Sequence, residues 1–249
     1  LKEREDYTLI GTWVGGVENE QLVTGQPLFG SDQSLPDMVY ATYQKCPAFG
    51  GKVLSANLDH IRSLDGVLDA FVLEGTGDVS EIMPGVAIVA TSTWHALQAQ
   101  SALEIEWDES EASKDSWTDA LAEARGLAGT KGLETKISKG DVDAAMASAA
   151  HTVVSFYTYP FVSHAPMEPQ NCTAWYRGGE VEIWAPTQTP ERGVSSVATV
   201  FGLPIEKVTL HQVRSGGGFG RRLYNNFICE AVAISERIGG PVKLQWSRE

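Results

Sequence analysis

The pattern of apolar and polar residues between positions 36 and 108 alternates between strands and helices. Runs rich in β-branched and aromatic residues are typical of strands, and segments that begin at a Ser, Thr or Asn cap are typical of helices. The predicted strands are 38–43, 52–54, 67–72, 86–90 and 104–107, and the predicted helices are 57–62 and 94–103. Alternation of this kind predicts one compact α/β unit.

Beyond residue 108 the pattern first becomes polar and then β-rich. Polar amphipathic helices are predicted at 113–128 and at 141–149, and we interpret this region as a connector on the surface. Strands are predicted at 151–158, 171–176 and 181–184. Gly178-Gly179 between the last two strands is a strong hairpin signal.

A glycine-rich stretch, Ser215-Gly216-Gly217-Gly218-Phe219-Gly220-Arg221-Arg222, lies between a predicted strand at 208–213 and an amphipathic helix that follows it. Glycine reaches positive φ and lets a ligand approach the backbone, and a helix that starts at such a loop adds free amide groups. A loop that binds an anionic ligand is therefore favoured over a purely structural turn.

The composition is that of an ordinary globular protein with an acidic balance. Hydrophobic residues make up 43% of the 249 residues, and the formal net charge is −13. This charge argues against a nucleic-acid partner, because phosphate binding needs a basic surface. No apolar run approaches the roughly 18 residues of a membrane helix, so no membrane insertion is expected. The acidic stretch 65–123, in which Lys114 is the single base, is interpreted as a solvated face, with a docking surface for a basic partner as the alternative.

Several common active-site patterns are absent from the sequence. Cys46, Cys172 and Cys229 are widely spaced and form no C-x-x-C pair, so an Fe–S cluster would have to reside on another chain. The glycine loop does not fit the dinucleotide fingerprint, because Arg221 occupies the position of its third glycine. The sequence contains no Walker A motif, nucleophile elbow or H-E-x-x-H motif, and no Ser or Cys nucleophile can be nominated.

His164-Ala-Pro-Met-Glu168-Pro169 brings two ionisable groups together, but the prolines exclude the helical spacing of a metal-binding pair. A structural role for Glu168, bonded to backbone or to His164, is therefore favoured over direct catalysis. Arg221-Arg222 could bind phosphate or could lie on the surface in the first turn of the following helix. Because they would face the positive end of the helix dipole, a bound phosphate or an acidic neighbour is favoured beside them.

Gln188 lies in the segment Trp184-Ala-Pro-Thr-Gln188-Thr-Pro190, between a predicted strand and a predicted helix that Gly202 ends. Two flanking prolines make the turn rigid, so that the amide can be held in one direction. An uncharged amide both donates and accepts hydrogen bonds, which suits an oxo ligand or a substrate heteroatom. In isolation, a capping or surface role would be favoured for this residue.

Together these segments resemble the molybdenum hydroxylases of the xanthine dehydrogenase and aldehyde oxidase family. They are most similar to the large β subunit of isoquinoline 1-oxidoreductase-type enzymes. The resemblance is carried by His164-Ala-Pro-Met-Glu-Pro169, Trp184-Ala-Pro-Thr-Gln188, Gly202-Leu-Pro204 and Gly216-Gly-Gly-Phe-Gly-Arg-Arg222. The stretch from Val23-Thr-Gly-Gln-Pro-Leu-Phe-Gly30 to Glu106-Trp-Asp108 resembles the α/β-hammerhead domain of the same subunit, so the resemblance spans nearly the whole chain in the family's order.

The resemblance implies an α+β fold in which an α/β-hammerhead domain is followed by the first part of a mixed α/β molybdopterin-binding domain. The implied divisions are an extended entry segment at 1–20, the hammerhead at 21–110, a helical connector at 111–150 and the truncated cofactor-binding domain at 151–249. In the family, the glutamine of the Pro-Thr-Gln segment hydrogen-bonds an oxygen ligand of molybdenum, a role that falls to Gln188. The implied cofactor-binding residues are Gly217, Gly218, Phe219, Gly220, Arg221 and Arg222, where Arg221-Arg222 replaces the Gly-Lys of most members. No residue of this chain is expected to ligate the metal.

The implied reaction is hydroxylation of an N-heteroaromatic compound, or oxidation of an aldehyde, with oxygen from water. The implied cofactor is molybdopterin with Mo, as the cytosine dinucleotide, and electrons pass to a small partner subunit that holds 2Fe–2S clusters. The catalytic glutamate of the family lies near the C-terminal end of the subunit, outside this sequence, and Glu168 is not at that position. We therefore expect a piece of a longer subunit that alone binds no molybdenum and shows no turnover.

The alternative is a non-catalytic binding or assembly module in which the glycine loop is structural. The cofactor hypothesis requires Gln188 and the Phe219 backbone amide to face a common cavity, whereas the module hypothesis does not. The sequence assigns no substrate, electron acceptor or compartment.

Overall fold

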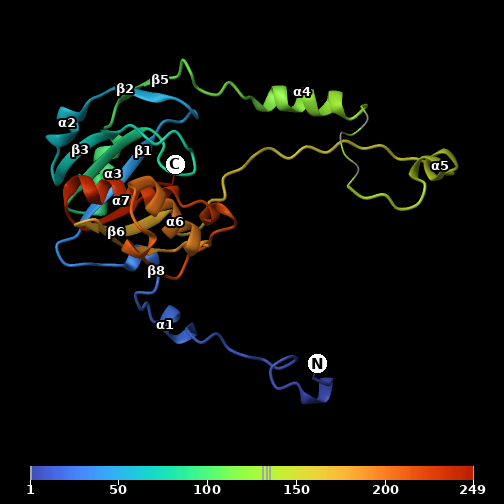
Figure 1. Ribbon diagram of the computed structural model, residues 1–249, viewed down its shortest axis with the longest axis horizontal. Coiled ribbons are helices and arrows are strands. Elements are labelled where there is room, and N and C mark those ends of the chain that lie inside the picture. The colour runs from blue at the N-terminus through green and yellow to red at the C-terminus, as the bar shows by residue number, and fades with distance from the viewer. Residues whose placement is uncertain (1, 131, 133, 135, 249) are drawn as a thin grey trace. The chain divides into compact units, whose positions relative to one another are not determined.

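The computed structural model describes residues 2–130, 132, 134 and 136–248. Contacts divide the chain into one unit of residues 1–112 and 164–249 and a second of residues 113–163. The larger unit contains a seven-stranded mixed sheet and a separate two-stranded sheet (Figure 1). The strands are β1 Val39–Lys45, β2 Lys52–Ala56, β3 Val67–Leu73, β4 Gly85–Ala90, β5 Ile105–Asp108, β6 Asn171–Arg177, β7 Glu180–Ala185, β8 Val208–Gln212 and β9 Val242–Gln245.

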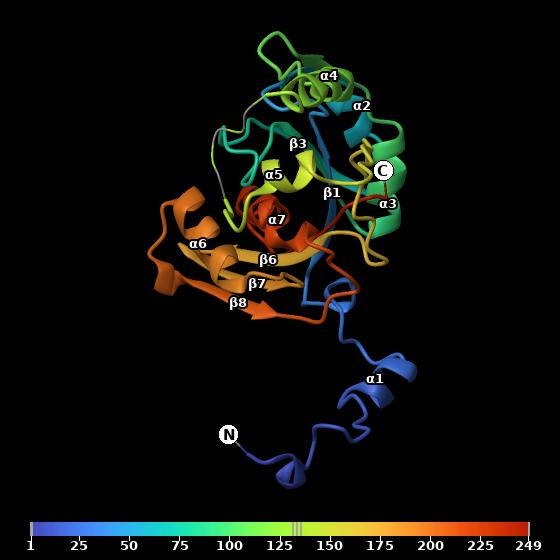
Figure 2. The same ribbon diagram turned by 90° about the vertical axis from the view of Figure 1, so that its right-hand side faces the viewer.

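The seven-stranded sheet has the order β3-β4-β1-β9-β6-β7-β8. β9 is its centre, because it pairs in parallel with β1 and antiparallel with β6. The last strand of the chain therefore joins the sheet segment near the N-terminus to the β6–β7–β8 segment, which Figure 2 shows beside α7. β2 and β5 pair with each other in the two-stranded sheet.

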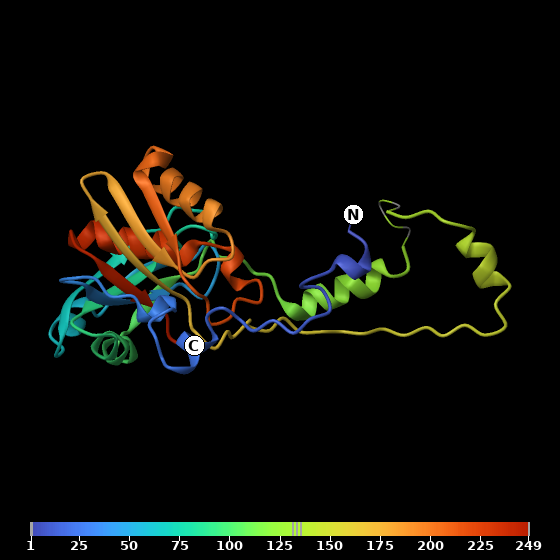
Figure 3. The same ribbon diagram turned by 90° about the horizontal axis from the view of Figure 1, so that it is seen from below.

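Alternating side chains of the large sheet enter two separate cores. Ala87 and Val89 of β4 belong to a core that contains Phe227 of α7. Ile88, between them, belongs to a second core with Ile61 of α2 and Ala99 of α3. Such alternation is what a strand buried on both faces requires. The helices of this unit are α1 Asn19–Val23, α2 Leu58–Arg62, α3 Thr93–Ser101, α6 Pro190–Phe201 and α7 Asn226–Ile238. Figure 3 shows α6 alongside the β6–β7–β8 segment, and α6 contacts β8 and α7.

The predicted α+β class and most predicted elements are confirmed. Helix α3 begins where the Ser92 side chain accepts a hydrogen bond from the His95 amide, and α6 has Pro190 at its start and ends at Gly202, whose φ is 61°. The β6–β7 hairpin turns at Gly178 and Gly179, both at positive φ. The domain boundaries at 21–110 and 151–249 stay a prediction, and in the structure β1, β3 and β4 of the first range share one sheet with the strands of the second.

The second unit contains the helices α4 Trp117–Leu127 and α5 Val142–Ala147, which lie within the predicted helices 113–128 and 141–149 and are capped by Ser116 and Asp141. The predicted strand at 151–158 is wrong, because this segment has no regular secondary structure. Its β-forming side chains have no partner strand among the described residues, and Val153 and Val154 are exposed. β-propensity without a neighbouring strand does not form a strand in this part of the chain.

Short 3-10 turns lie between several of these helices and strands, including the two on either side of β8 and the glycine loop. They are Gly30–Asp32, Ile205–Lys207 and Arg221–Leu223, and a further one lies near the N-terminus at Arg4–Asp6. The turn at Arg221–Leu223 separates the loop from α7, which begins only at Asn226. The prediction that Arg221 and Arg222 lie in the first turn of the helix is therefore wrong, and the helix dipole does not act on them as supposed.

Candidate functional site

The glycine loop follows β8 and has a backbone that needs its glycines. Gly217 and Gly220 have φ values of 108° and 95°, and Phe219 between them has a φ of 52°. Backbone in this region favours glycine, and Phe219 is one of three non-glycine residues at positive φ in the described chain. Its side chain is turned outward and is 76% exposed. The loop therefore presents its backbone rather than packed side chains at this point.

Glu168 holds the start of the glycine loop in place. Its Oε2 accepts hydrogen bonds from the Gly216 amide at 2.7 Å and from Arg222 Nη2 at 3.2 Å. Its Oε1 accepts from the Ser31 amide at 3.1 Å and from Asn171 Nδ2 at 2.9 Å. The carboxylate thus joins three segments of the chain, and the predicted structural role of Glu168 is confirmed. The sequence alone did not identify Ser31 or Asn171 as partners.

The two arginines after the loop have different environments. Arg222 is fully buried and donates to Glu168 and to the carbonyl oxygens of Gly217 and Glu168 at 2.8 and 2.9 Å. The acidic neighbour expected for this pair is therefore Glu168, and the guanidinium of Arg222 is directed into the protein. Arg221 is half-buried and donates through Nη2 to Asn226 Oδ1 at 3.1 Å.

Gln188 contacts the glycine loop directly. The side-chain Oε1 of Gln188 accepts a hydrogen bond from the Gly220 amide at 3.2 Å. The backbone amide of Gln188 donates to the Arg222 carbonyl at 3.0 Å. A Cβ at position 218 would lie 2.5 Å from Gln188 Oε1, so Gly218 leaves the space that the carboxamide occupies. Because Oε1 is bound to the loop, Nε2 is the donor that remains for a ligand on this exposed side.

Three consecutive backbone amides of the loop are available for binding. Among the described residues, no acceptor is found for the amides of Gly217, Gly218 and Phe219. Successive free amides in a glycine loop form the kind of concave donor group that binds anions. Together with Gln188 Nε2, which comes from a segment about 30 positions earlier in the chain, they supply uncharged donors. This arrangement suits a ligand that carries oxygen or other acceptor atoms close to the backbone.

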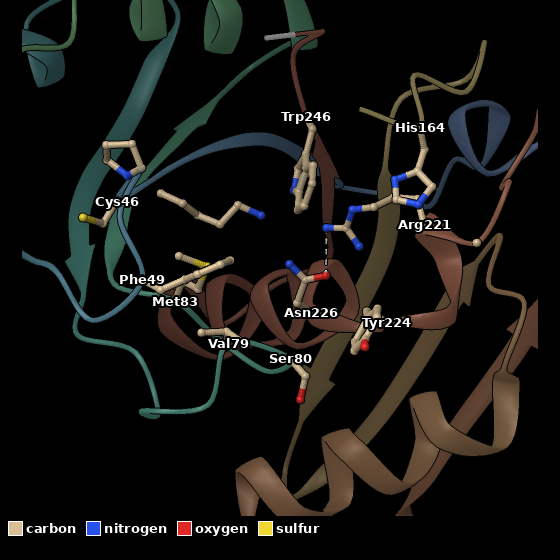
Figure 4. Close-up of a pocket in the computed structure, with 13 residues that line it drawn as sticks. Cys46, Phe49, Val79, Ser80, Met83, His164, Arg221, Tyr224, Asn226 and Trp246 are labelled. Carbon is tan, nitrogen blue, oxygen red and sulfur yellow. Dashed lines mark hydrogen bonds between the residues drawn. The ribbon is translucent and has the colours of Figure 1, made fainter. Parts of the chain in front are cut away.

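A pocket of about 570 Å³ lies on the Arg221 side of the loop (Figure 4). It is lined by Lys45, Cys46, Pro47, Phe49, Val79, Ser80, Met83, His164, Gly220, Arg221, Tyr224, Asn226 and Trp246. Neither Gln188 nor Phe219 lines it, so this pocket is not the common cavity that the sequence-based hypothesis required. The loop thus has an exposed side with Gln188 and a second side that faces a pocket.

A buried charge cluster lies beneath this pocket. Glu230 is completely buried and accepts hydrogen bonds from Lys45 Nζ at 3.0 Å, Trp246 Nε1 at 2.9 Å and Asn226 Nδ2 at 3.3 Å. Lys45 Nζ also lies 3.1 Å from the centre of the Trp246 ring. Burial lowers the pKa of Lys45, and the Glu230 carboxylate opposes this shift. The sequence did not reveal this cluster, because Lys45 and Glu230 are 185 positions apart.

The described residues contain no group of three or more His, Cys, Asp or Glu side chains that could hold a metal ion. Within the same described ranges, no helix has the length and apolar character needed to cross a membrane.

Comparisons with known proteins identify a related domain family and related proteins. Residues 128–249 match the molybdopterin cofactor-binding domain family. The whole chain is 32% identical over 254 residues to a membrane-bound pyrroloquinoline-quinone aldehyde dehydrogenase of Gluconacetobacter polyoxogenes, and 30% identical over 260 residues to the beta subunit of isoquinoline 1-oxidoreductase of Brevundimonas diminuta. It covers 32% of the length of each of these two relatives.

The fold is also found in solved structures. Quinoline 2-oxidoreductase from Pseudomonas putida 86 superposes with a TM-score of 0.69 over 94% of this chain and 34% of its own, at 20% sequence identity. The chain therefore spans about a third of the proteins it resembles. Residues 128–249 belong to the molybdopterin cofactor-binding domain family, and the whole chain is similar to large subunits of the xanthine dehydrogenase and aldehyde oxidase family, as its ordered motifs predict.

Proposed function

We propose that the exposed side of the glycine loop binds the molybdopterin cofactor of a molybdenum hydroxylase. The observation that carries this proposal is the contact between Gln188 and the loop, in which the Gly220 amide donates to Gln188 Oε1 at 3.2 Å. Two segments that the resemblance implies for cofactor binding are 32 positions apart in the sequence and meet in the fold.

The residues present fit such a group. The free amides of Gly217, Gly218 and Phe219 and the Nε2 donor of Gln188 can bind acceptor atoms of a cofactor that has many oxygen and sulfur atoms. Gly220 lets the cofactor approach the backbone without a side chain in the way, whereas Gly218 leaves room for the Gln188 carboxamide. Of the proposed binding residues, Arg222 acts from inside the protein, by fixing the loop together with Glu168.

When bound, molybdopterin with Mo supplies the redox chemistry for transfer of oxygen from water to a carbon atom. The chain's own residues bind and orient. Gln188 donates from Nε2 toward an oxygen atom of the cofactor, while its Oε1 remains fixed by the Gly220 amide. Because the amide is uncharged, it can polarise an acceptor without changing the net charge of the site. Glu168 and Arg222 keep the loop in the conformation that leaves its amides free.

We propose N-heteroaromatic compounds or aldehydes as substrates of the intact enzyme. This is supported by the names of the relatives, which include isoquinoline 1-oxidoreductase, nicotinate dehydrogenase and aldehyde dehydrogenase subunits. The cofactor is proposed to be the cytosine dinucleotide form. The electron acceptor is proposed to be a small subunit with 2Fe–2S clusters, since the three cysteines Cys46, Cys172 and Cys229 are buried and separate.

We also propose that residues 1–249 alone retain no molybdenum and show no turnover. The support is that the chain covers only 32% of each of two relatives, and that the resemblance implies a catalytic glutamate outside these residues. Elemental analysis of the purified 249-residue chain tests this. One molybdenum atom per chain would contradict it.

The test of the proposed function uses the purified full-length protein. Elemental analysis is expected to find molybdenum, and a pterin is expected in the extracted cofactor. One relative is named for pyrroloquinoline quinone, so the same extract is examined for that quinone. A quinone without molybdenum would contradict the proposal. A protein with neither cofactor would instead support the binding or assembly module.

A further inference from the structure

Arg221 is a half-buried cation that, unlike Arg222, has no salt bridge to a carboxylate among the described residues. Arg222 forms a salt bridge with Glu168 at 3.2 Å, whereas among the described residues Arg221 forms no salt bridge. The one hydrogen bond described for the Arg221 side chain goes to the neutral amide of Asn226. Burial lowers the pKa of the Arg221 guanidinium, and the Glu230 charge raises it in part. Several of its N–H donors therefore remain for a ligand.

The Glu230 carboxylate, whose charge acts on Arg221, already has hydrogen-bond partners. Glu230 binds Lys45, Asn226 and Trp246, and it lies beneath the pocket rather than in its wall. The wall itself contains Lys45 and Arg221 and no aspartate or glutamate. Because Glu230 balances the charge of Lys45, Arg221 is the one cation of the pocket wall without a described ion pair, in a chain whose formal net charge is −13. Such a wall favours an anionic ligand.

The opposite wall of the pocket is apolar. Phe49, Val79 and Met83 lie across the pocket from Arg221 and Trp246 in Figure 4. Both cations lie close to the indole of Trp246, Lys45 Nζ at 3.1 Å and the Arg221 guanidinium at 4.9 Å from the ring centre. The indole thus fixes the positions of the two charges. A ligand that fills this space needs a charged end toward Arg221 and an apolar body toward Phe49.

We propose that this pocket binds an organic carboxylate with a flat apolar body, its carboxylate on Arg221 and its ring against Phe49, Val79 and Met83. The volume of about 570 Å³ is sufficient for an aromatic acid. Arg221 can donate two parallel hydrogen bonds to a carboxylate, which adds direction to the charge attraction. This pocket lies on the other side of the loop from Gln188, so the proposal goes beyond the proposed function and does not rest on it. Binding itself does not require turnover.

Benzoate and benzamide provide a matched pair of probes, because they share a ring and differ in charge. Isothermal titration of the purified full-length protein is expected to give a Kd for benzoate on the order of 1 mM or tighter. Benzamide is expected to bind at least roughly tenfold more weakly, the loss typical of one charge-assisted hydrogen bond. Equal binding of the two, or no binding of benzoate in the millimolar range, would overturn the proposal without any variant.

The Arg221→Gln variant tests the residue. Glutamine can still bond Asn226, so the turn is expected to keep its conformation, which circular dichroism checks. Benzoate affinity is expected to fall roughly tenfold, whereas Arg192→Gln, which removes the same charge from an exposed position of α6, should leave it unchanged. An equal loss in both variants would overturn the assignment to Arg221, because it would indicate a general charge effect.

Inorganic phosphate separates the proposed ligand from an unspecific anion. Phosphate is expected to bind more weakly than benzoate, since it has no apolar body to bury. Phosphate that binds as tightly as benzoate would overturn the aromatic acid in favour of a simple anion. The molybdenum content is measured on the same preparation. Tighter binding of benzoate than of benzamide and phosphate, in a protein without molybdenum, would support this site and contradict the proposed function. Molybdenum in a protein that does not prefer benzoate would support the proposed function and contradict this site.

Discussion

The guanidinium of Arg222 and the carboxylate of Glu168 form a salt bridge of 3.2 Å in which both side chains are almost completely buried. The same carboxylate accepts the Gly216 amide, and the same guanidinium donates to the Gly217 carbonyl. The pair therefore holds the first half of the glycine loop from both sides. It leaves the amides of Gly217, Gly218 and Phe219 without an acceptor among the described residues.

Glu168→Gln should destabilise the protein substantially. The substitution leaves Arg222 buried without a counter-charge, and removal of one partner of a buried pair costs about 3–5 kcal/mol. The free energy of unfolding from urea titration measures this loss. As a control, Glu180→Gln breaks the exposed pair between Lys207 and Glu180 and should leave the midpoint unchanged. A Glu168 variant as stable as that control would contradict the structural role of the pair.

Stability should fall at alkaline pH because of Tyr43. Burial raises the pKa of the Tyr43 phenol above its ordinary value of about 10, and the charges of Glu230 and Glu74 raise it further. The folded protein therefore keeps this proton while the unfolded chain releases it. Stability from this group is complete below about pH 10 and is lost as the pH rises toward the folded pKa, at about 1.4 kcal/mol per pH unit.

Tyr43→Phe isolates this effect. At neutral pH the variant should be less stable by about 1 kcal/mol, because it loses the 2.6 Å hydrogen bond from Tyr43 to the Met83 carbonyl. Urea titrations at pH 9 and 11 should show that the difference between the two proteins shrinks by about 1 kcal/mol. A difference that stays constant over this range would show that Tyr43 titrates normally in the folded state.

Two of the three cysteines should be chemically inert in the folded protein. Burial raises the pKa of both the Cys172 and the Cys229 thiols, so that little thiolate is present near neutral pH. Iodoacetamide at pH 8, followed by peptide mass spectrometry, should leave both unmodified until denaturant is added. Rapid alkylation of Cys172 or Cys229 before unfolding would indicate that this core opens readily.

Gln188→Glu should separate folding from the proposed catalytic role. A glutamate oxygen can still accept from the Gly220 amide, but the Nε2 donor is lost and a negative charge is introduced. Stability should change little, because the side chain is exposed, whereas kcat of the full-length enzyme should fall about 100-fold. The matched change Gln98→Glu, at an exposed position of α3, should leave kcat unaffected. Equal rates for both variants would remove Gln188 from the proposed mechanism.

Much of the fold could be predicted from the sequence because its signals are local. The helices α3 and α4 and the turn at Gly178-Gly179 depend on neighbouring residues, and each lies in the range in which it was predicted. The segment 151–158 has the composition of a strand but no partner, and a partner is a property of the whole fold. Local propensity alone therefore predicted a strand that does not form.

The candidate site was predictable in part. The ordered motifs identified Gln188 and the glycine loop, and the structure brings Gln188 Oε1 and the Gly220 amide together. The inward direction of Arg222 was not predictable, because its partner Glu168 is 54 positions away. The cluster of Lys45, Glu230 and Trp246 joins β1, α7 and the segment after β9, so only the folded chain shows it.

The molybdenum content of a Gly218→Ala variant of the full-length protein tests the central claim most directly. The new Cβ would lie 2.5 Å from Gln188 Oε1, so the carboxamide must move away from the loop. Gly240→Ala is the control, because a Cβ there meets nothing within 4 Å. We predict that wild-type protein and the control contain equal amounts of molybdenum, and that Gly218→Ala contains a minor fraction of it while unfolding at a similar urea concentration. Equal molybdenum in all three proteins, or none in the wild type, would contradict a cofactor site at this loop.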